Sequence, residues 1–189
     1  MLQTERSFLR AQLLEGHDEL LEECVREVGG RLEDYPPIVI YGRACRQRRS
    51  IGFFSDTSAG YSYSNQVAAS QPLSDNLRLL LQLVNELYGA SFNGVLVNRY
   101  NGGADSIGKH SDDEAGLDPE VGVVSLSYGA ARKFRVRDKK GAVVADVLTR
   151  PGLLVHMGGD FQKEFTHEVP AEKASAGVRV SFTFRRHRA

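Results

Sequence analysis

Hydrophobic residues recur at helical spacing in several segments before residue 90. Within residues 1–30 this period comes in two pieces, of which the second begins at Asp18, a candidate N-terminal cap, and ends at Gly29-Gly30. A further segment begins at Ser74 and ends at Gly89, residue types that favour the start and the end of a helix. We predict helices in these segments. The apolar stripe of the last helix comprises Leu77, Leu80, Leu81, Val84, Leu87 and Tyr88.

Beyond Phe92 the hydrophobic period changes from that of a helix to that of a strand, with Gly, Asp and Pro between the segments. The predicted strands are 93–100, 121–128, 132–137, 142–148, 152–157 and 176–185. Upstream, residues 38–41 are predicted as one short strand, and residues 42–72 as hairpins and loops outside the core. This order favours a mainly β protein with N-terminal helices (α+β), in which helices support a sandwich or jelly roll.

The composition is that of one globular domain. The chain has 189 residues, of which 41% are hydrophobic, and no apolar run long enough to span a membrane. Cys24 and Cys45 lack metal-ligand spacing, so both are predicted as buried thiols. We expect a reduced intracellular protein, cytoplasmic or nuclear, that is a monomer and does not bind membranes.

The net charge is zero, which argues against a uniformly basic nucleic-acid-binding protein. Basic residues are nevertheless concentrated locally, within 43–49, 132–140 and 185–188. Such clusters could follow a phosphate backbone, but each could equally be an ordinary solvated surface. Charge alone therefore leaves nucleic-acid binding open.

Two histidines and an aspartate in the strand-rich half are candidate metal ligands. His110 and Asp112 would point to the same side of an extended chain, and His167 follows 57 residues after His110. Two histidines and one carboxylate are the ligand set of non-haem Fe(II) oxygenases, which leaves open positions for a co-substrate and O2. An HxD pair taken alone is common by chance, so a solvated loop remains the alternative for it.

Residues 177–185 alternate between apolar and polar side chains. One face of this predicted strand comprises Arg179, Ser181, Thr183 and Arg185. If the face is buried, the two arginines require an anion, because an unpaired buried guanidinium is costly. The small residues between them leave room for a short dicarboxylate such as 2-oxoglutarate, which both arginines could bind. An exposed edge strand with solvated arginines is the alternative. Asn98 and Tyr100 share a face of an earlier strand and could donate to the same ligand.

The order and spacing of these motifs resemble the AlkB family of nucleic-acid dealkylating dioxygenases. The matching stretches are 97–100, 106–114 and 124–130, His167, and Arg179-x5-Arg185. The resemblance implies a single domain over 1–189, with a double-stranded β-helix (jelly roll) catalytic core at 92–186. Residues 1–91 would then form helical support and a nucleotide-recognition lid. The implied cofactors are Fe(II), 2-oxoglutarate as co-substrate, and O2, with the metal held by His110, Asp112 and His167.

The same resemblance assigns roles around the co-substrate. Arg179 and Tyr100 would bind the far (C5) carboxylate of 2-oxoglutarate, and Arg185 and Asn98 the near one. Ser181 departs from the asparagine that is usual in the family, which shortens one donor and puts one hydrogen bond in doubt.

Upstream, a weaker resemblance extends to the members that repair double-stranded DNA. Tyr41 would fill the gap left by a flipped base, and Tyr61 and Tyr63 would line the base pocket. Core packing is the alternative for these tyrosines. Arg43 and Arg49 would contact phosphates.

The implied reaction is oxidative demethylation of bases such as 1-methyladenine and 3-methylcytosine, in DNA or in RNA. Glu114 would accept a hydrogen bond from the exocyclic amine of the base, and Asp113 would instead support the metal ligands; the sequence does not separate the roles of these two acids. One alternative is a 2-oxoglutarate oxygenase that acts on RNA or protein substrates. The other is an inactive nucleic-acid-binding module, against which the complete set of metal ligands argues.

Overall fold

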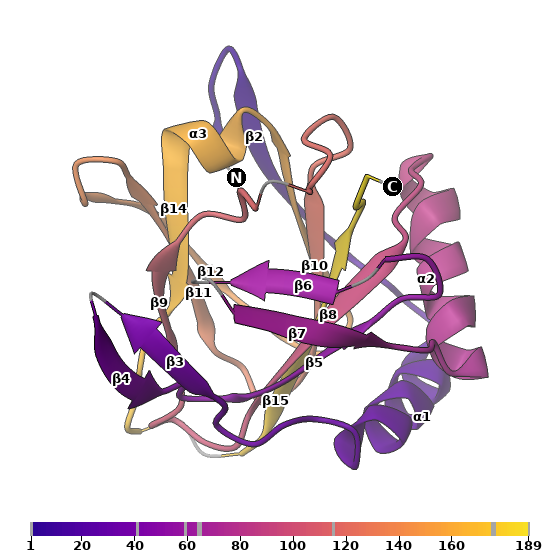
Figure 1. Cartoon of the computed structure of the whole chain (residues 1–189). Coiled ribbons are helices and arrows are strands. Elements are labelled where there is room, and N and C mark those ends of the chain that lie inside the picture. The colour runs from indigo at the N-terminus through magenta and orange to yellow at the C-terminus, as the bar shows by residue number, and fades with distance from the viewer. Residues whose placement is uncertain are drawn as a thin grey trace.

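The computed structural model describes residues 2–40, 42–58, 60–63, 66–114, 116–174 and 177–188, without the side chains of Ile40, 61–63 and 66–68. The described chain forms a large sheet, a smaller sheet and a separate hairpin (Figure 1). The helices are α1 (Asp18–Gly29), α2 (Asp75–Tyr88) and the short α3 (Phe161–Glu164). None of the helices in these segments is both long and apolar enough to cross a membrane.

Among the described residues, the larger sheet has nine strands in the order β1-β2-β13-β10-β15-β8-β5-β7-β6. Their bounds are β1 Leu2–Gln3, β2 Ser7–Leu13, β5 Ser50–Phe54, β6 Gly60–Tyr63, β7 Gln66–Gln71, β8 Gly94–Tyr100, β10 Val123–Gly129, β13 Leu153–Gly159 and β15 Arg179–Arg185. The smaller sheet has the order β12-β11-β14-β9. Its strands are β9 Ile107–His110, β11 Lys133–Asp138, β12 Val143–Leu148 and β14 Phe165–Val169. The remaining strands, β3 (Pro37–Ile40) and β4 (Arg43–Arg46), pair with each other.

The two long helices lie side by side over one face of the larger sheet (Figure 1). Because alternate residues of a strand point to opposite faces, Val180, Phe182 and Phe184 of β15 all point toward the helices. They pack there with the buried stripes of α1 and α2 in the largest apolar cluster of the described chain. The α2 prediction is confirmed, since the Ser74 side chain accepts a hydrogen bond from the helix and Gly89 ends it in the left-handed conformation.

The other face of the larger sheet is turned toward the smaller sheet. A second apolar cluster fills part of this space, with Val155 and Met157 of β13 against Phe134 and Val136 of β11. The polar residues of β15 point into the same space and line a cavity there. This pair of facing sheets is the double-stranded β-helix, or jelly roll, and the predicted fold class is confirmed.

The first residues differ from the helical prediction. Ser7–Leu13 is a strand that pairs antiparallel with β13, from Ser7 opposite Gly159 to Leu13 opposite Leu153. The hydrogen bonds of this ladder outweigh the helix preference of its Leu, Arg, Ala and Gln residues. Asp18 is also not the cap that we predicted. His17 occupies the N-cap position without a side-chain hydrogen bond, and Asp18 lies in the first turn, where its negative charge favours the helix dipole.

Three further expectations are wrong. Residues 42–72 are not all outside the core, because β5 is buried along its whole length and pairs with β8 on one side and β7 on the other. Leu87, in the last turn of α2, is 47% exposed. Cys45 is exposed in the β3–β4 hairpin, whereas Cys24 is buried as predicted. The larger sheet thus takes strands from both sides of residue 91, so the N-terminal half contributes to the sheet that carries the site.

Candidate active site

His110, Asp112 and His167 converge at one end of the space between the sheets. His110 ends β9, Asp112 lies in the loop that follows, and His167 stands opposite His110 in the paired strand β14. Their candidate ligand atoms all lie within 4.8 Å of one another. Nε2 of each histidine is 3.6 Å from an oxygen of the Asp112 carboxylate. The convergence predicted from the HxD…H spacing is therefore present.

The protonation of these side chains suits a metal ion. Nδ1 of His110 is 2.9 Å from the carbonyl oxygen of Gly108, which can only accept, so Nδ1 carries the proton and Nε2 keeps its lone pair. Burial, with a smaller contribution from His110, lowers the pKa of His167 to about 3. Burial by itself would raise the pKa of Asp112, but attraction from Arg185 and both histidines outweighs it and lowers that pKa to about 2. Neutral imidazoles and an ionised carboxylate are the forms that bind metal.

Arg185 joins the metal-ligand group to Glu114. Its Nη2 lies 2.6 Å from Oδ1 of Asp112, and its Nη1 donates to Oε1 of Glu114. All three side chains are largely buried, and the two carboxylates together carry one negative charge more than the guanidinium offsets. Nε2 of His187 lies 3.9 Å from the same Glu114 oxygen. The predicted burial of Arg185 is confirmed, and its partners in the structure are carboxylates of the protein itself.

Arg179, at the other end of β15, has a different environment. Its Nη2 donates to Oγ of Ser127 at 2.8 Å, and its guanidinium lies 5.2 Å from the centre of the Tyr100 ring. Nε and Nη1 are buried without a hydrogen-bond partner among the described residues. A buried cation with open donors fits an anionic ligand, because leaving those donors unpaired is costly. This end of the cavity therefore suits a carboxylate.

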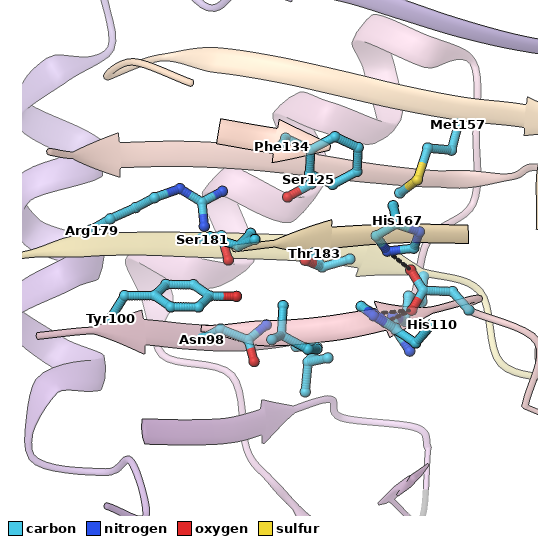
Figure 2. A pocket seen from close by; sticks show the side chains of 15 residues that line it. Asn98, Tyr100, His110, Ser125, Phe134, Met157, His167, Arg179, Ser181 and Thr183 are labelled. Carbon is cyan, nitrogen blue, oxygen red and sulfur yellow. Dashed lines mark hydrogen bonds and ion pairs between the residues drawn. The ribbon is translucent and has the colours of Figure 1, made fainter. Parts of the chain in front are cut away.

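The two ends belong to one cavity between the sheets. Figure 2 shows Arg179, Tyr100 and Asn98 gathered at one end, and His110 and His167 at the other. Ser181 and Thr183 lie between these groups on β15. The residues thus fit both a metal ion and a diacid beside it.

The comparisons with known proteins agree with this geometry. A family model described as the 2OG-Fe(II) oxygenase superfamily matches residues 7–185. The chain belongs to this superfamily. It is therefore an Fe(II)- and 2-oxoglutarate-dependent dioxygenase that uses O2, as the motifs predicted.

Relatives place the dioxygenase in the AlkB family. It is 31% identical over 178 residues to the DNA oxidative demethylase ALKBH2 of Homo sapiens, a match that covers 89% of this chain and 68% of the human protein. It is 34% identical over 135 residues to the alpha-ketoglutarate-dependent dioxygenase alkB homolog 3 of Bos taurus, covering 66% of this chain and 47% of that protein. A solved structure, that of OsALKBH1, has a TM-score of 0.60 and 19% identity, and covers 98% of this chain and 100% of that one. That likeness supports the fold.

The residues predicted to bind the co-substrate all line the cavity of the dioxygenase. Asn98 and Tyr100 come from β8, which pairs with β15 so that Asn98 stands opposite Ser181 and Tyr100 opposite Arg179. Both β8 side chains are buried. The pattern of β8 alone does not identify them; they were predicted together with the other motifs and the family resemblance, and the pairing of β8 with β15 brings their side chains to the same cavity.

Arg49 is not a surface phosphate contact in this structure, contrary to the prediction from its basic neighbourhood. Its side chain is 3% exposed, and its Nε donates to Oδ1 of Asn98 at 2.7 Å. Arg43, in contrast, is exposed on β4 and remains available to a nucleic acid. The sequence gives no sign of this difference, because both residues belong to the same basic stretch.

The tyrosine predictions fall partly or wholly outside the described structure. Tyr41 lies outside the described residues, and for Tyr61 and Tyr63 the structure describes the backbone in β6 but not the side chains. Glu114, which pairs with Arg185, and its exposed neighbour Asp113 both line a second cavity that also borders Asp112.

Two residues near the site were not found from the sequence. Arg132 is buried, and its guanidinium donates to the carbonyl oxygens of Gly102, Asp105 and Pro170 while lying 5.6 Å from the Tyr100 ring centre. Gln162 of α3 accepts a hydrogen bond from the backbone N–H of Asp112 at 2.9 Å. Both residues form hydrogen bonds with partners that are far away in the sequence, so a local sequence pattern could not reveal these contacts.

Proposed function

We propose that this dioxygenase removes methyl groups from the Watson–Crick edge of nucleic-acid bases, with 1-methyladenine and 3-methylcytosine in DNA as substrates. The observation that carries the proposal is that three metal ligands share one cavity with a buried arginine whose donors are open. The matched relatives named as DNA oxidative demethylases support DNA as the substrate class.

In this proposal His110, Asp112 and His167 hold the iron. Arg179 and Tyr100 bind the C5 carboxylate of 2-oxoglutarate, while Asn98 and Arg185 serve the carboxylate nearer the metal. Ser181 and Thr183 provide the floor of the site between them.

Bound iron and 2-oxoglutarate supply the oxidising chemistry: O2 and 2-oxoglutarate are consumed, the methyl group is hydroxylated and lost as formaldehyde, and succinate and CO2 are formed. The chain itself orients the reactants and excludes water. Burial of both sheets' inner faces shields the cavity, and the fixed tautomer of His110 directs its Nε2 toward the metal position.

Glu114 is proposed to recognise the methylated base. These bases carry positive charge. Burial by itself would raise the pKa of Glu114, but Arg185 and a hydrogen bond with His187 outweigh it and lower that pKa, so Glu114 is ionised. A carboxylate can accept from the exocyclic amine of the base and attract its charged ring. Arg43 on the exposed β4 is a proposed phosphate contact, and Tyr41, Tyr61 and Tyr63 are proposed to contact the flipped base and its neighbours.

Mass spectrometry of oligonucleotides tests the function directly. Oligonucleotides with one 1-methyladenine or one 3-methylcytosine are incubated with Fe(II), 2-oxoglutarate and enzyme, as single- and double-stranded DNA and as RNA. We expect a loss of one methyl mass from DNA, with succinate formed in step, and no loss with Asp112→Ala. Demethylation of RNA alone would reject DNA as the substrate class. Demethylation that persists in Asp112→Ala would reject the metal site.

A further inference from the structure

Arg49 lies between the start of β5, the strand β8 and the residues that lead into β9. It immediately precedes β5, whose first residue Ser50 stands opposite Arg99 of β8. The carbonyl oxygen of Arg48 accepts a hydrogen bond from the backbone N–H of Ser106 at 2.9 Å, just before the strand that carries His110. The backbone around Arg49 is therefore held from both sides, and its buried side chain points toward the co-substrate residues of β8.

The contact with Asn98 determines how the asparagine amide is oriented. A guanidinium can only donate hydrogen bonds, so the amide atom that faces Arg49 at 2.7 Å must be the oxygen Oδ1. The Nδ2 group, with its two donors, then faces away from Arg49. Asn98 lines the cavity and is buried, so solvent does not compete for these donors.

This orientation matters because the two ends of an amide are nearly alike in shape. Rotating the amide by half a turn about the last side-chain torsion exchanges Oδ1 and Nδ2 and costs little free energy by itself. A hydrogen bond from a neighbouring residue therefore decides which orientation the amide adopts. With Oδ1 turned into the cavity, Asn98 would present a lone pair to a carboxylate and repel it. With Nδ2 turned there, it donates.

We propose that Arg49 is a positioning residue of the co-substrate site, which fixes the Asn98 amide so that its N–H donors serve 2-oxoglutarate. The proposal rests on the assignment of Asn98 to the co-substrate under the proposed function. It replaces the phosphate contact that the basic stretch suggested, and it makes 2-oxoglutarate binding depend on Arg49 in the absence of nucleic acid.

The test is calorimetric titration of 2-oxoglutarate into the Mn(II)-loaded protein, without iron and without nucleic acid. Arg49→Met, which keeps an unbranched apolar chain but loses every donor, should weaken 2-oxoglutarate binding by roughly tenfold, about one directed hydrogen bond. Arg48→Met is the matched control, because Arg48 is an exposed arginine one residue away, and it should leave this affinity unchanged. Mn(II) affinity should be the same in both. Wild-type affinity in Arg49→Met would overturn the proposal.

Asn98→Ala separates this inference from the assignment on which it rests. If Asn98→Ala does not weaken 2-oxoglutarate binding, the assignment of Asn98 to the co-substrate is wrong. If it does weaken binding while Arg49→Met does not, the assignment survives and the positioning role is rejected. The double variant should bind no more weakly than Asn98→Ala alone, because Arg49 acts through Asn98; additive losses would contradict this.

A purely structural role is distinguished by a further substitution. Arg49→Gln can accept as well as donate a hydrogen bond, so it no longer selects Oδ1 of Asn98. It should also weaken 2-oxoglutarate binding, with its thermal unfolding temperature close to that of the wild type. Should Arg49→Met fail to fold, Arg49→Gln decides the question alone, and full co-substrate affinity in it would contradict the proposal.

Discussion

The two ends of β15 carry the same residue type in opposite states. Arg179 and Arg185 are both 2% exposed and stand on the same face of one strand. Arg185 is already neutralised by Asp112 and Glu114, whereas Nε and Nη1 of Arg179 are buried without a hydrogen-bond partner among the described residues. The fold thus pairs the charge of Arg185 with its own carboxylates and leaves the charge of Arg179 to be paired by a ligand.

This difference indicates how the site separates its two tasks. At the Arg185 end, the guanidinium keeps Asp112 ionised before any metal arrives, and so prepares a ligand. At the Arg179 end, burial lowers the pKa of the guanidinium, and no carboxylate of the described chain pairs with it. An anionic ligand can therefore form the ion pair that the protein itself does not provide. One end is prepared for a cation and the other for an anion.

The largest effect is expected from Asp112→Ala, which removes both a metal ligand and a partner of Arg185. Turnover should fall to background, and Mn(II) affinity should fall by more than about 100-fold, beyond the range seen when an outer partner of a metal ligand is lost. Calorimetric titration with Mn(II) measures the affinity. Asp113→Ala is the matched control for metal binding, since Asp113 is an exposed neighbour of the same type. Equal losses in both variants would show that Asp112 is not a ligand.

Arg179→Met tests the anion end. Loss of the charged donors should weaken 2-oxoglutarate binding by roughly 30-fold, about 2 kcal/mol, and leave Mn(II) affinity unchanged. Arg185→Met should differ from it by weakening Mn(II) binding as well, because Asp112 loses its partner. If Arg179→Met and Arg185→Met change the Mn(II) and 2-oxoglutarate affinities equally, metal binding and anion binding are not divided between the two ends of β15.

The pH dependence of stability tests the metal end without any metal. Since the pKa of His167 is lowered to about 3 from an unfolded value near 6.5, the unfolded protein binds more protons between these pH values. Stability of the chelator-treated protein should therefore fall as the pH decreases from about 6.5 toward 3, by on the order of a few kcal/mol. Denaturant unfolding at several pH values measures this. In His167→Asn the slope should be shallower; an unchanged slope would show that His167 is not the group responsible.

Ser181→Asn is expected to have the smallest effect. Ser181 is buried between the two arginines and stands opposite Asn98 on the neighbouring strand. A longer amide there should add one hydrogen bond to the co-substrate and tighten 2-oxoglutarate binding about three- to fivefold. Calorimetric titration of the Mn(II)-loaded variant measures this. Weaker binding than in the wild type would show that the serine is required by the space available in this chain.

The strand-rich half could be predicted because its pattern and its pairing agree. In β15, strict alternation separates the polar face from the apolar face, so one pattern predicts both the core and the cavity. Its neighbour β8 begins with apolar residues on both faces, and only Asn98 and Tyr100 mark its cavity side. The metal ligands were predicted from the HxD pair and His167 read together with the alternating strand that carries Arg179 and Arg185. The strands that bring two of these ligands together, β9 and β14, were not among the predicted ones.

The N-terminal half was harder because long-range contacts decide its structure. Residues 7–13 have a composition that favours a helix, and they become a strand only through pairing with β13. The buried strand β5 contains Gly52 and lies in a stretch rich in Arg and Ser, so no clear period marks it. Arg49 is indistinguishable from Arg48 in sequence, and only the fold turns one inward and leaves the other exposed.

The β3–β4 hairpin differs from the other strands in one respect that matters for protein engineering. In the described chain it pairs with neither sheet, although it is joined directly to the segment that ends at Arg49. The hairpin can therefore be exchanged for others of different length and sequence without breaking a ladder of either sheet. If it contacts the nucleic acid as proposed, libraries of such exchanges would vary which nucleic acids are accepted while the metal and co-substrate residues stay the same.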